Sequence, residues 1–165
     1  MLKIIVTGPE SSGKTTLCKA LSEHFKIPYS EEFAREYLDA LNRDYNQDDL
    51  LKIAKGQLTS EQNSSLLDTD LITIKIWSKY KYGSCDKWIL NQIEKQKSEK
   101  RFYLLCKPDI PWEADPQREN PNDREELFEI YKKEAESLGH DYFIVEEENR
   151  TEKSISKISP LISLI

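Results

Sequence analysis

Residues 3–15 read KIIVTGPESSGKT, and this stretch decides the fold. Residues 3–7 are mainly apolar and β-branched, which indicates a buried strand. Residues 8–15 match the pattern G-x-x-x-x-G-K-[ST] at every position, and Leu17, Leu21 and Phe25 then follow at helical spacing. A buried strand, a glycine-rich loop and an amphipathic helix in this order predict a phosphate-binding P-loop.

The chemistry of such a loop follows from its residue types. The glycines allow backbone angles and a close approach that a Cβ would obstruct, so the amide groups turn inward around phosphate oxygens. The dipole of the following helix adds to this field, while the lysine reaches the β- and γ-phosphates and the threonine hydroxyl ligates Mg²⁺. A glycine-rich turn with a merely solvated lysine is the alternative. We expect ATP and Mg²⁺ as cofactors, held by Gly8, Pro9, Glu10, Ser11, Ser12, Gly13, Lys14, Thr15 and Thr16.

Beyond the loop, strand-like and helix-like stretches alternate along the chain. Such alternation predicts an α/β fold with a parallel sheet covered by helices on both faces, the three-layer sandwich of P-loop NTPases. We expect one domain over residues 1–165. The expected strands are 3–7, 28–32, 66–68, 101–106 and 142–145, and the expected helices are 15–25, 33–41, a helix capped by Asn46 or Asp48 and running through Leu58, 71–80, 125–138 and 155–165. Residues 72–76 are ambiguous because they alternate as in a strand, but continuing through Trp77 and Tyr80 gives a helical stripe, so we expect a helix there.

The composition of the chain argues against nucleic acids and membranes as its partners. Twenty-four basic and 30 acidic residues give a net charge of −6 and a sequence pI near 5.1, which argues against a general nucleic-acid binder. No apolar run approaches the roughly 20 residues of a membrane span. Three cysteines without a CxxC pair fit free thiols in a reducing compartment. We therefore expect a cytoplasmic protein that contacts neither membrane nor nucleic acid and acts on a small molecule.

Acidic residues follow two of the expected strands. Asp68 comes after a short apolar run and is a candidate carboxylate for Mg²⁺, with Asp70 two residues further on; both could instead cap the next helix. Glu32 follows the second expected strand and is a candidate base for the acceptor hydroxyl, with Arg35 one helical step later. An acidic first turn that complements the helix dipole explains Glu32 equally well.

A proline-rich segment predicts a lid. Four of the seven prolines lie within residues 108–121, so residues 108–124 cannot form a regular helix or central strand. Arg118 or Arg124 could stabilise charge on the transferred phosphate, or both could neutralise an acidic loop. Trp112 could stack on an aromatic substrate or anchor a hinge.

Several sequence blocks together resemble the NadR-type ribosylnicotinamide kinase domain. The P-loop is similar to that family's G-x-E-S-S-G-K-[ST] loop, and residues 32–37 (EFAREY) are similar to its E-Y-x-R-E-Y segment, with phenylalanine in place of the first tyrosine. Gly56-Gln57 matches a G-[HQ] position in its third helix. Residues 68–73 (DTDLIT) resemble its D-T-D-F-I-T block, and residues 108–115 (PDIPWEAD) resemble its P-D-x-P-W-x-x-D lid entry.

The resemblance implies a kinase that transfers the γ-phosphate of ATP to the 5′-hydroxyl of nicotinamide riboside, on a five-stranded parallel sheet. It implies that Glu32 or Asp70 activates the hydroxyl and that an arginine-bearing lid closes over the phosphates. The alternatives are a kinase of another nucleoside or small metabolite, a P-loop ATPase, and an ATP-binding switch module. The implied positions are Arg118 and Arg124 over the phosphates, Arg35, Tyr37 and Gln57 in the acceptor pocket, and Arg150 near adenine.

Overall fold

A five-stranded parallel sheet forms the centre of the molecule, as predicted. The computed structural model describes residues 1–165. The strand order is β2-β3-β1-β4-β5, so β1 lies in the middle and both neighbours lie further along the chain. The strands are β1 (Lys3–Thr7), β2 (Tyr29–Ser30), β3 (Leu66–Asp68), β4 (Arg101–Cys106) and β5 (Asp141–Val145).

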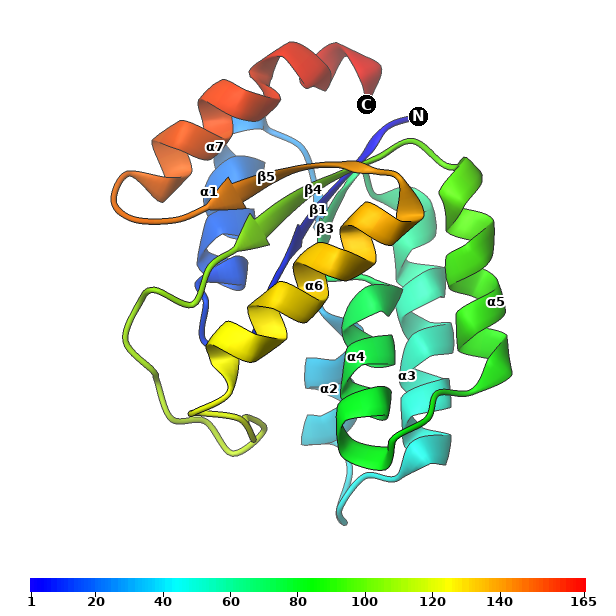
Figure 1. Cartoon of the computed structure of the whole chain (residues 1–165). Coiled ribbons are helices and arrows are strands. Elements are labelled where there is room, and N and C mark those ends of the chain that lie inside the picture. The colour runs from blue at the N-terminus through cyan, green and yellow to red at the C-terminus, as the bar shows by residue number, and fades with distance from the viewer.

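Helices cover both faces of this sheet, which gives three layers (Figure 1). Helices α1 and α7 pack on one face, and α3, α4, α5 and α6 pack on the other, with α2 against α3. The helices are α1 (Lys14–Phe25), α2 (Phe33–Asp39), α3 (Gln47–Ser60), α4 (Leu71–Tyr82), α5 (Lys87–Lys95), α6 (Arg124–Leu138) and α7 (Arg150–Ile158).

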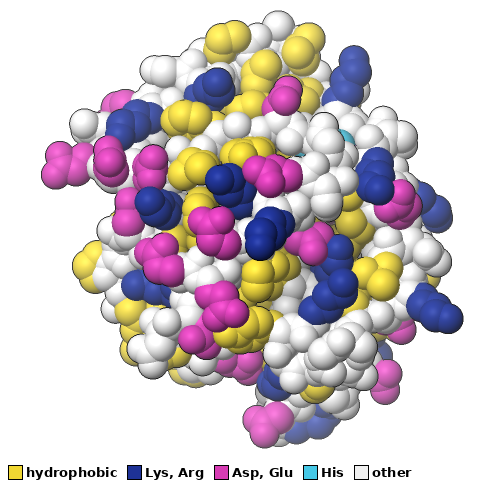
Figure 2. Space-filling model, viewed as in Figure 1, with side chains coloured by type: hydrophobic (Ala, Val, Ile, Leu, Met, Phe, Trp, Pro, Cys, Tyr) yellow, Lys and Arg dark blue, Asp and Glu magenta, His cyan; other side chains and the backbone are white.

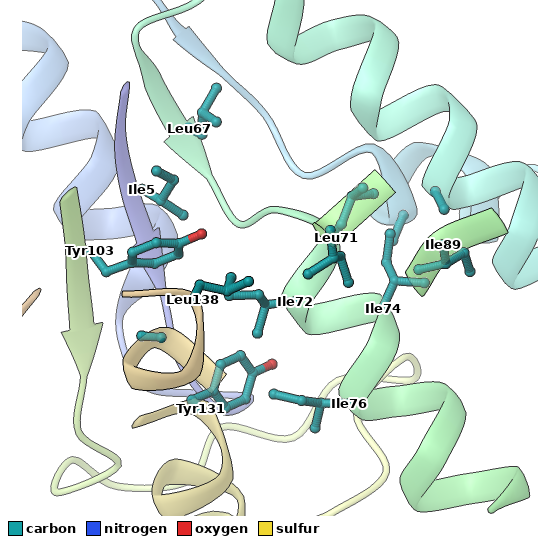
Figure 3. Close-up of a cluster of buried hydrophobic side chains, with 14 of the residues drawn as sticks. Ile5, Leu67, Leu71, Ile72, Ile74, Ile76, Ile89, Tyr103, Tyr131 and Leu138 are labelled. Carbon is teal, nitrogen blue, oxygen red and sulfur yellow. The ribbon is translucent and has the colours of Figure 1, made fainter. Parts of the chain in front are cut away.

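Each strand supplies both halves of the core because its side chains alternate between the faces. In β1, Ile4 and Val6 face α1 and α7, while Ile5 faces the opposite layer. Figure 3 shows Ile5 and Tyr103 of the sheet packed toward Ile72 of α4 and Leu138 of α6. Both faces of the sheet are therefore buried, which is the usual condition for an all-parallel sheet.

One expected element differs from the structure, one helix was not expected, and one open choice is settled. The stretch 155–165 is not one helix: α7 ends at Ile158, and a 3₁₀ turn with Pro160 near its start continues to Leu164, because proline cannot supply the N–H of an α-helical turn. Helix α5 was not predicted at all. The cap of α3 is Asn46, whose side chain accepts from Asp49 N while the Asp49 carboxylate accepts from Asn46 N, a reciprocal capping box.

The ambiguous stretch after residue 70 is helical. Helix α4 begins after Asp70, whose carboxylate accepts from Ile72 N, and ends at Gly83 in the left-handed conformation. The chain contains no helix with the length and apolar character that a membrane crossing demands. Basic and acidic side chains are intermingled over the face seen in Figure 2.

Candidate active site

The loop between β1 and α1 has the conformation that its glycines allow. Gly8 has φ +146°, and a Cβ there would lie 2.5 Å from the Cys106 carbonyl oxygen of β4. Gly13 has φ +82° and precedes the first residue of α1. These positions favour glycine for steric reasons, and the loop ends directly at a helix N-terminus, where backbone N–H groups favour an anion.

Lys14 is folded back across this loop. Its ammonium donates to the carbonyl oxygens of Gly8 at 2.9 Å and Pro9 at 3.3 Å, and the Ser12 hydroxyl donates to the Pro9 oxygen at 2.7 Å. The cation therefore lies against the loop rather than in open solvent.

Thr15 and Asp68 meet where the ends of α1 and β3 come together. The Thr15 hydroxyl donates to Asp68 Oδ2 at 2.7 Å, while Oδ1 of the same carboxylate is buried without a hydrogen-bond partner. Burial and the nearby Glu32 carboxylate raise the pKa of Asp68 to about 6. A buried carboxylate oxygen without a partner, next to a hydroxyl, fits the oxygen donors that Mg²⁺ prefers.

A cavity of about 170 Å³ opens over the loop, and we call it the P-loop cavity. Residues 10–16 line it, together with Glu32, Arg35 and Arg118. A larger open groove continues from it past Thr15, Glu32 and Asp68. The cavity and the groove together bring polar groups from distant parts of the sequence close to one another. These groups are the Lys14 ammonium, the Thr15 hydroxyl, the Glu32 and Asp68 carboxylates, and the guanidinium groups of Arg35 and Arg118.

Glu32 occupies the residue before α2 but does not cap that helix with its side chain. Its carboxylate lines the P-loop cavity instead. Arg35, one turn later, donates to both carboxylate oxygens of Asp115 at 2.8–2.9 Å and so joins α2 to the loop that follows β4.

Residues 107–123 form that loop and contact the P-loop at several points. The Glu10 carboxylate accepts from Glu119 N at 3.0 Å and Asn120 N at 3.1 Å, and the Ser11 hydroxyl accepts from Glu113 N at 2.8 Å. Arg118 of this loop and Arg124, the first residue of α6, differ in position. Arg118 lines the P-loop cavity, whereas Arg124 donates to the Ser11 and Ile110 carbonyls at 3.0 and 3.1 Å and lies 5.5 Å from the Trp112 ring.

A second cavity, of about 340 Å³, adjoins the first, and we call it the aromatic cavity. Tyr45, Trp77 and Tyr80 give it three rings. It shares Glu10, Trp77 and Gln117 with the P-loop cavity, so the two volumes meet. The remaining lining consists of Leu38, Lys81, Glu119, Asn120 and Leu127.

Asp70 does not face either cavity, contrary to the expectation that it could act as a base. It is fully buried, and its carboxylate accepts from Ile72 N, from Arg101 at 3.1 Å and from Tyr103 at 2.6 Å. The positive φ of Thr69 turns the chain after Asp68, which directs Asp70 into the core instead of the crevice. Its role as a helix cap, the other alternative, is the one observed.

Three further predicted binding residues are engaged in the protein itself. The Tyr37 hydroxyl donates to Asp49 at 2.7 Å, and Gln57 is 1 % exposed, so neither lines the two cavities. Arg150 donates to the carbonyls of Ser12 and Lys107 at 3.1 and 2.8 Å and pairs with Asp109. Arg150 therefore holds the P-loop backbone at Ser12 and lines neither cavity.

Sequence reasoning missed the aromatic cavity. Trp77, Tyr80 and Lys81 lie at i, i+3 and i+4 on α4, and in the sequence Trp77 and Tyr80 served only to favour a helix over a strand. Two aromatic residues beside a lysine at that spacing are the signal that could have indicated a half-exposed face. Tyr45 and Gln117 carry no comparable local signal.

The chain is similar to a known family and to several solved structures. A family model described as an AAA domain matches residues 3–153. Among solved structures, NadR protein in complex with NR and NadR protein in complex with NAD and AMP-PNP are both 26 % identical, with TM-scores of 0.72 and 0.70. They match over 96 % of this chain, which spans about half of their length (50 and 49 %). No curated protein matches significantly.

More distant structures share the fold. YorR protein from Bacillus subtilis, in complex with phosphorylated GDP, is 19 % identical with a TM-score of 0.65, and the match covers 99 % of this chain and 96 % of that one. Deoxyadenosine kinase from M. mycoides with bound dCTP is 13 % identical with a TM-score of 0.59, over 96 % and 98 % of the two chains. The chain therefore belongs to the AAA domain family, as a NadR-like P-loop kinase domain.

Proposed function

We propose that this chain is an ATP-dependent kinase that phosphorylates the 5′-hydroxyl of nicotinamide riboside and releases nicotinamide mononucleotide and ADP. The observation that carries the proposal is the junction of the two cavities at Glu10, Trp77 and Gln117. One cavity carries the groups that suit phosphates, and the other carries aromatic rings that suit a flat ring. In a nucleoside, the ribose joins a flat ring to the 5′-hydroxyl that accepts the phosphate, so one nucleoside can occupy both cavities.

The charge of the aromatic cavity favours a nucleoside with a cationic ring. The pyridinium ring of nicotinamide riboside carries a fixed positive charge, and aromatic faces and carboxylates attract such a group. Glu10 and Glu119 contribute two carboxylates to the lining. The ammonium of Lys81 lies 3.8 Å from the Tyr45 ring centroid and 3.2 Å from a Glu119 oxygen, so Glu119 offsets the charge of this lysine within the cavity and the Glu10 carboxylate leaves the lining net negative.

In the proposed reaction, Glu32 accepts the proton of the 5′-hydroxyl. The ribose oxygen forms a bond to the γ-phosphorus while the bond from that phosphorus to the β,γ-bridging oxygen breaks, and ADP leaves with the electron pair. Lys14 and Arg118 stabilise the charge that spreads over the phosphate oxygens. Thr15 and Asp68 would hold Mg²⁺, which supplies further neutralisation when bound.

Support for this class of acceptor also comes from the NadR structure in complex with NR, which is 26 % identical to this chain. The test is direct analysis of products after incubation with Mg-ATP and, separately, nicotinamide riboside, nicotinic acid riboside, adenosine, cytidine and uridine. We expect a phosphorylated product from nicotinamide riboside at a rate at least tenfold above that from the neutral nucleosides. If a neutral nucleoside is the preferred acceptor, the chain is a kinase but nicotinamide riboside is not its substrate. If no acceptor is phosphorylated, the proposal is overturned.

A further inference from the structure

We propose that Gln57 is a positioning residue that holds the candidate base Glu32 and the candidate metal-side carboxylate Asp68 in a fixed relation; the proposal rests on the proposed function. The side chain of Gln57 joins the residues that follow these two carboxylates. Its Oε1 accepts from Phe33 N at 3.0 Å, and its Nε2 donates to the Thr69 carbonyl oxygen at 3.3 Å. Both ends of one buried amide are used, on two different segments.

The bond to Phe33 leaves Glu32 free for chemistry. The first N–H groups of a helix lack partners within it, and the residue before the helix usually satisfies one of them with its own side chain. Glu32 occupies that place in α2 but makes no such bond. Gln57 of α3 satisfies one of these N–H groups, that of Phe33, the first residue of the helix. The Glu32 carboxylate lines the P-loop cavity while the N–H that follows it in the chain stays paired.

The bond to Thr69 fixes the turn that follows Asp68. Thr69 has φ +68°, a left-handed conformation that non-glycine residues rarely adopt, and it is 2 % exposed. Its N–H donates to the Val6 oxygen of β1 at 2.9 Å, and its carbonyl accepts from Gln57. A turn held on both sides keeps Asp68 beside Thr15, because the backbone cannot relax to a less strained conformation.

The neighbour of Gln57 brings the two helices close enough for this bridge. A Cβ on Gly56 would lie 2.1 Å from the Phe33 ring, so the ring packs directly on the backbone of α3. Gly56 and Gln57 thus dock the first turn of α2 through one ring contact and one hydrogen bond. We infer that the pair sets the distance from α2 to β3, and with it the distance between the two carboxylates.

The test compares Gln57→Ala with Gln96→Ala in the whole chain. Gln96 is a matched control because it is also 1 % exposed, but it precedes the amino end of β4, whereas the P-loop follows the carboxyl end of the parallel β1, and its side chain has no hydrogen-bond partner. Two quantities are measured at a temperature where both variants are folded by circular dichroism. One is turnover, measured as kcat and KM for ATP at saturating nicotinamide riboside; the other is the affinity for a fluorescent ATP analogue with and without Mg²⁺.

For Gln57→Ala we expect kcat to fall at least tenfold with KM for ATP changed less than threefold, and the gain in nucleotide affinity on adding Mg²⁺ to shrink at least threefold. Gln96→Ala keeps both quantities within twofold. In Gln57→Glu, the side chain donates to Thr69 only when protonated, so its kcat relative to wild type rises as pH falls from 8 to 6.

Unchanged kcat and Mg²⁺ response in Gln57→Ala, or equal losses in both alanine variants, would overturn the positioning role. Binding of the ATP analogue needs no acceptor. If the wild type phosphorylates no nucleoside, the proposed function fails, and the Mg²⁺-dependent binding still decides the role of Gln57.

Discussion

The hydroxyl of Thr15 and the carboxylate of Asp68 lie 2.7 Å apart, although 53 positions separate them in the chain. Their contact follows from the strand order, because β3 lies directly beside β1 in the sheet and the loop after β1 leads into α1. The carboxyl ends of neighbouring parallel strands form one crevice in open α/β sheets. The catalytic proposal is built around this crevice.

Replacing Lys14 by alanine is expected to abolish turnover while the fold persists. The ammonium is the cation closest to the loop that would hold the phosphates, and its hydrogen bonds to Gly8 and Pro9 are partly exposed. We expect kcat/KM for ATP to fall at least 100-fold and Tm to change by less than about 3 °C. Wild-type turnover in Lys14→Ala would show that the loop does not act on phosphates.

Arg118 of the loop after β4 and Arg124 at the start of α6 are expected to have different effects when replaced. Arg118 faces the P-loop cavity, so Arg118→Ala should lower kcat by roughly 10- to 100-fold with little effect on ATP affinity. Arg124 holds the Ser11 and Ile110 carbonyls, so Arg124→Ala should weaken ATP binding and lower Tm. Steady-state kinetics with direct ATP titration separates the two effects. A loss of ATP affinity in Arg118→Ala together with a loss of kcat alone in Arg124→Ala would exchange the two roles.

Glu119 is expected to select for a positively charged acceptor. Glu119→Gln removes one carboxylate from the aromatic cavity and leaves Lys81 without its ion-pair partner, which repels a cationic ring. We expect KM for nicotinamide riboside to rise about fivefold, which corresponds to about 1 kcal/mol, while KM for a neutral nucleoside stays within twofold. Glu129→Gln, an exposed position on α6, is the matched control. Equal changes for both acceptors would contradict a charge-based role.

The free energy of unfolding should decrease as pH rises, because Glu61 loses its proton. This carboxylate is fully buried; burial and the nearby Asp70 carboxylate raise its pKa, the Arg101 guanidinium at 2.9 Å offsets the rise only partly, and the resulting pKa is about 7. A carboxyl pKa above its unfolded value means that the folded state holds the proton more tightly. Its stabilisation is therefore complete below about pH 4.5 and disappears as pH approaches 7.

The measurement for Glu61 is chemical denaturation between pH 5 and 7.5. We expect wild type to lose roughly 2–4 kcal/mol over the titration range of this group, and Glu61→Gln to show a flatter profile. Glu99→Gln is the control, because Glu99 pairs with the same arginine from a partly exposed position. Parallel profiles for wild type and Glu61→Gln would assign the slope to other groups.

The strand–loop–helix stretch at residues 3–25 could be predicted because each of its features is local. The pattern of Gly8, Gly13 and Lys14 depends on neighbours in sequence, and so does the alternation of strands and helices that implies a parallel sheet. Features that depend on the tertiary structure could not be predicted in this way. Asp70 and Asp68 share one strand-end pattern, and only the left-handed Thr69 sends one into the core and leaves the other at the crevice.

The role of Gln57 illustrates the same limit. A glutamine on an amphipathic helix gives no local sign of whether it reaches a cavity or bridges two buried segments. Its position is decided by the ring of Phe33 against Gly56, a contact between helices 23 positions apart in sequence. The aromatic cavity depends in the same way on the packing of α4 against Tyr45 and the lid segment.

The central claim is tested most directly by ADP release from Mg-ATP, measured in a coupled assay with and without nicotinamide riboside, for wild type and Lys14→Ala. The account predicts release by the wild type that depends on the acceptor, at least tenfold above the acceptor-free rate, and none by Lys14→Ala. ADP release at the same rate with and without nicotinamide riboside would contradict the kinase and leave an ATPase; ATP binding without any release would leave a nucleotide-dependent switch.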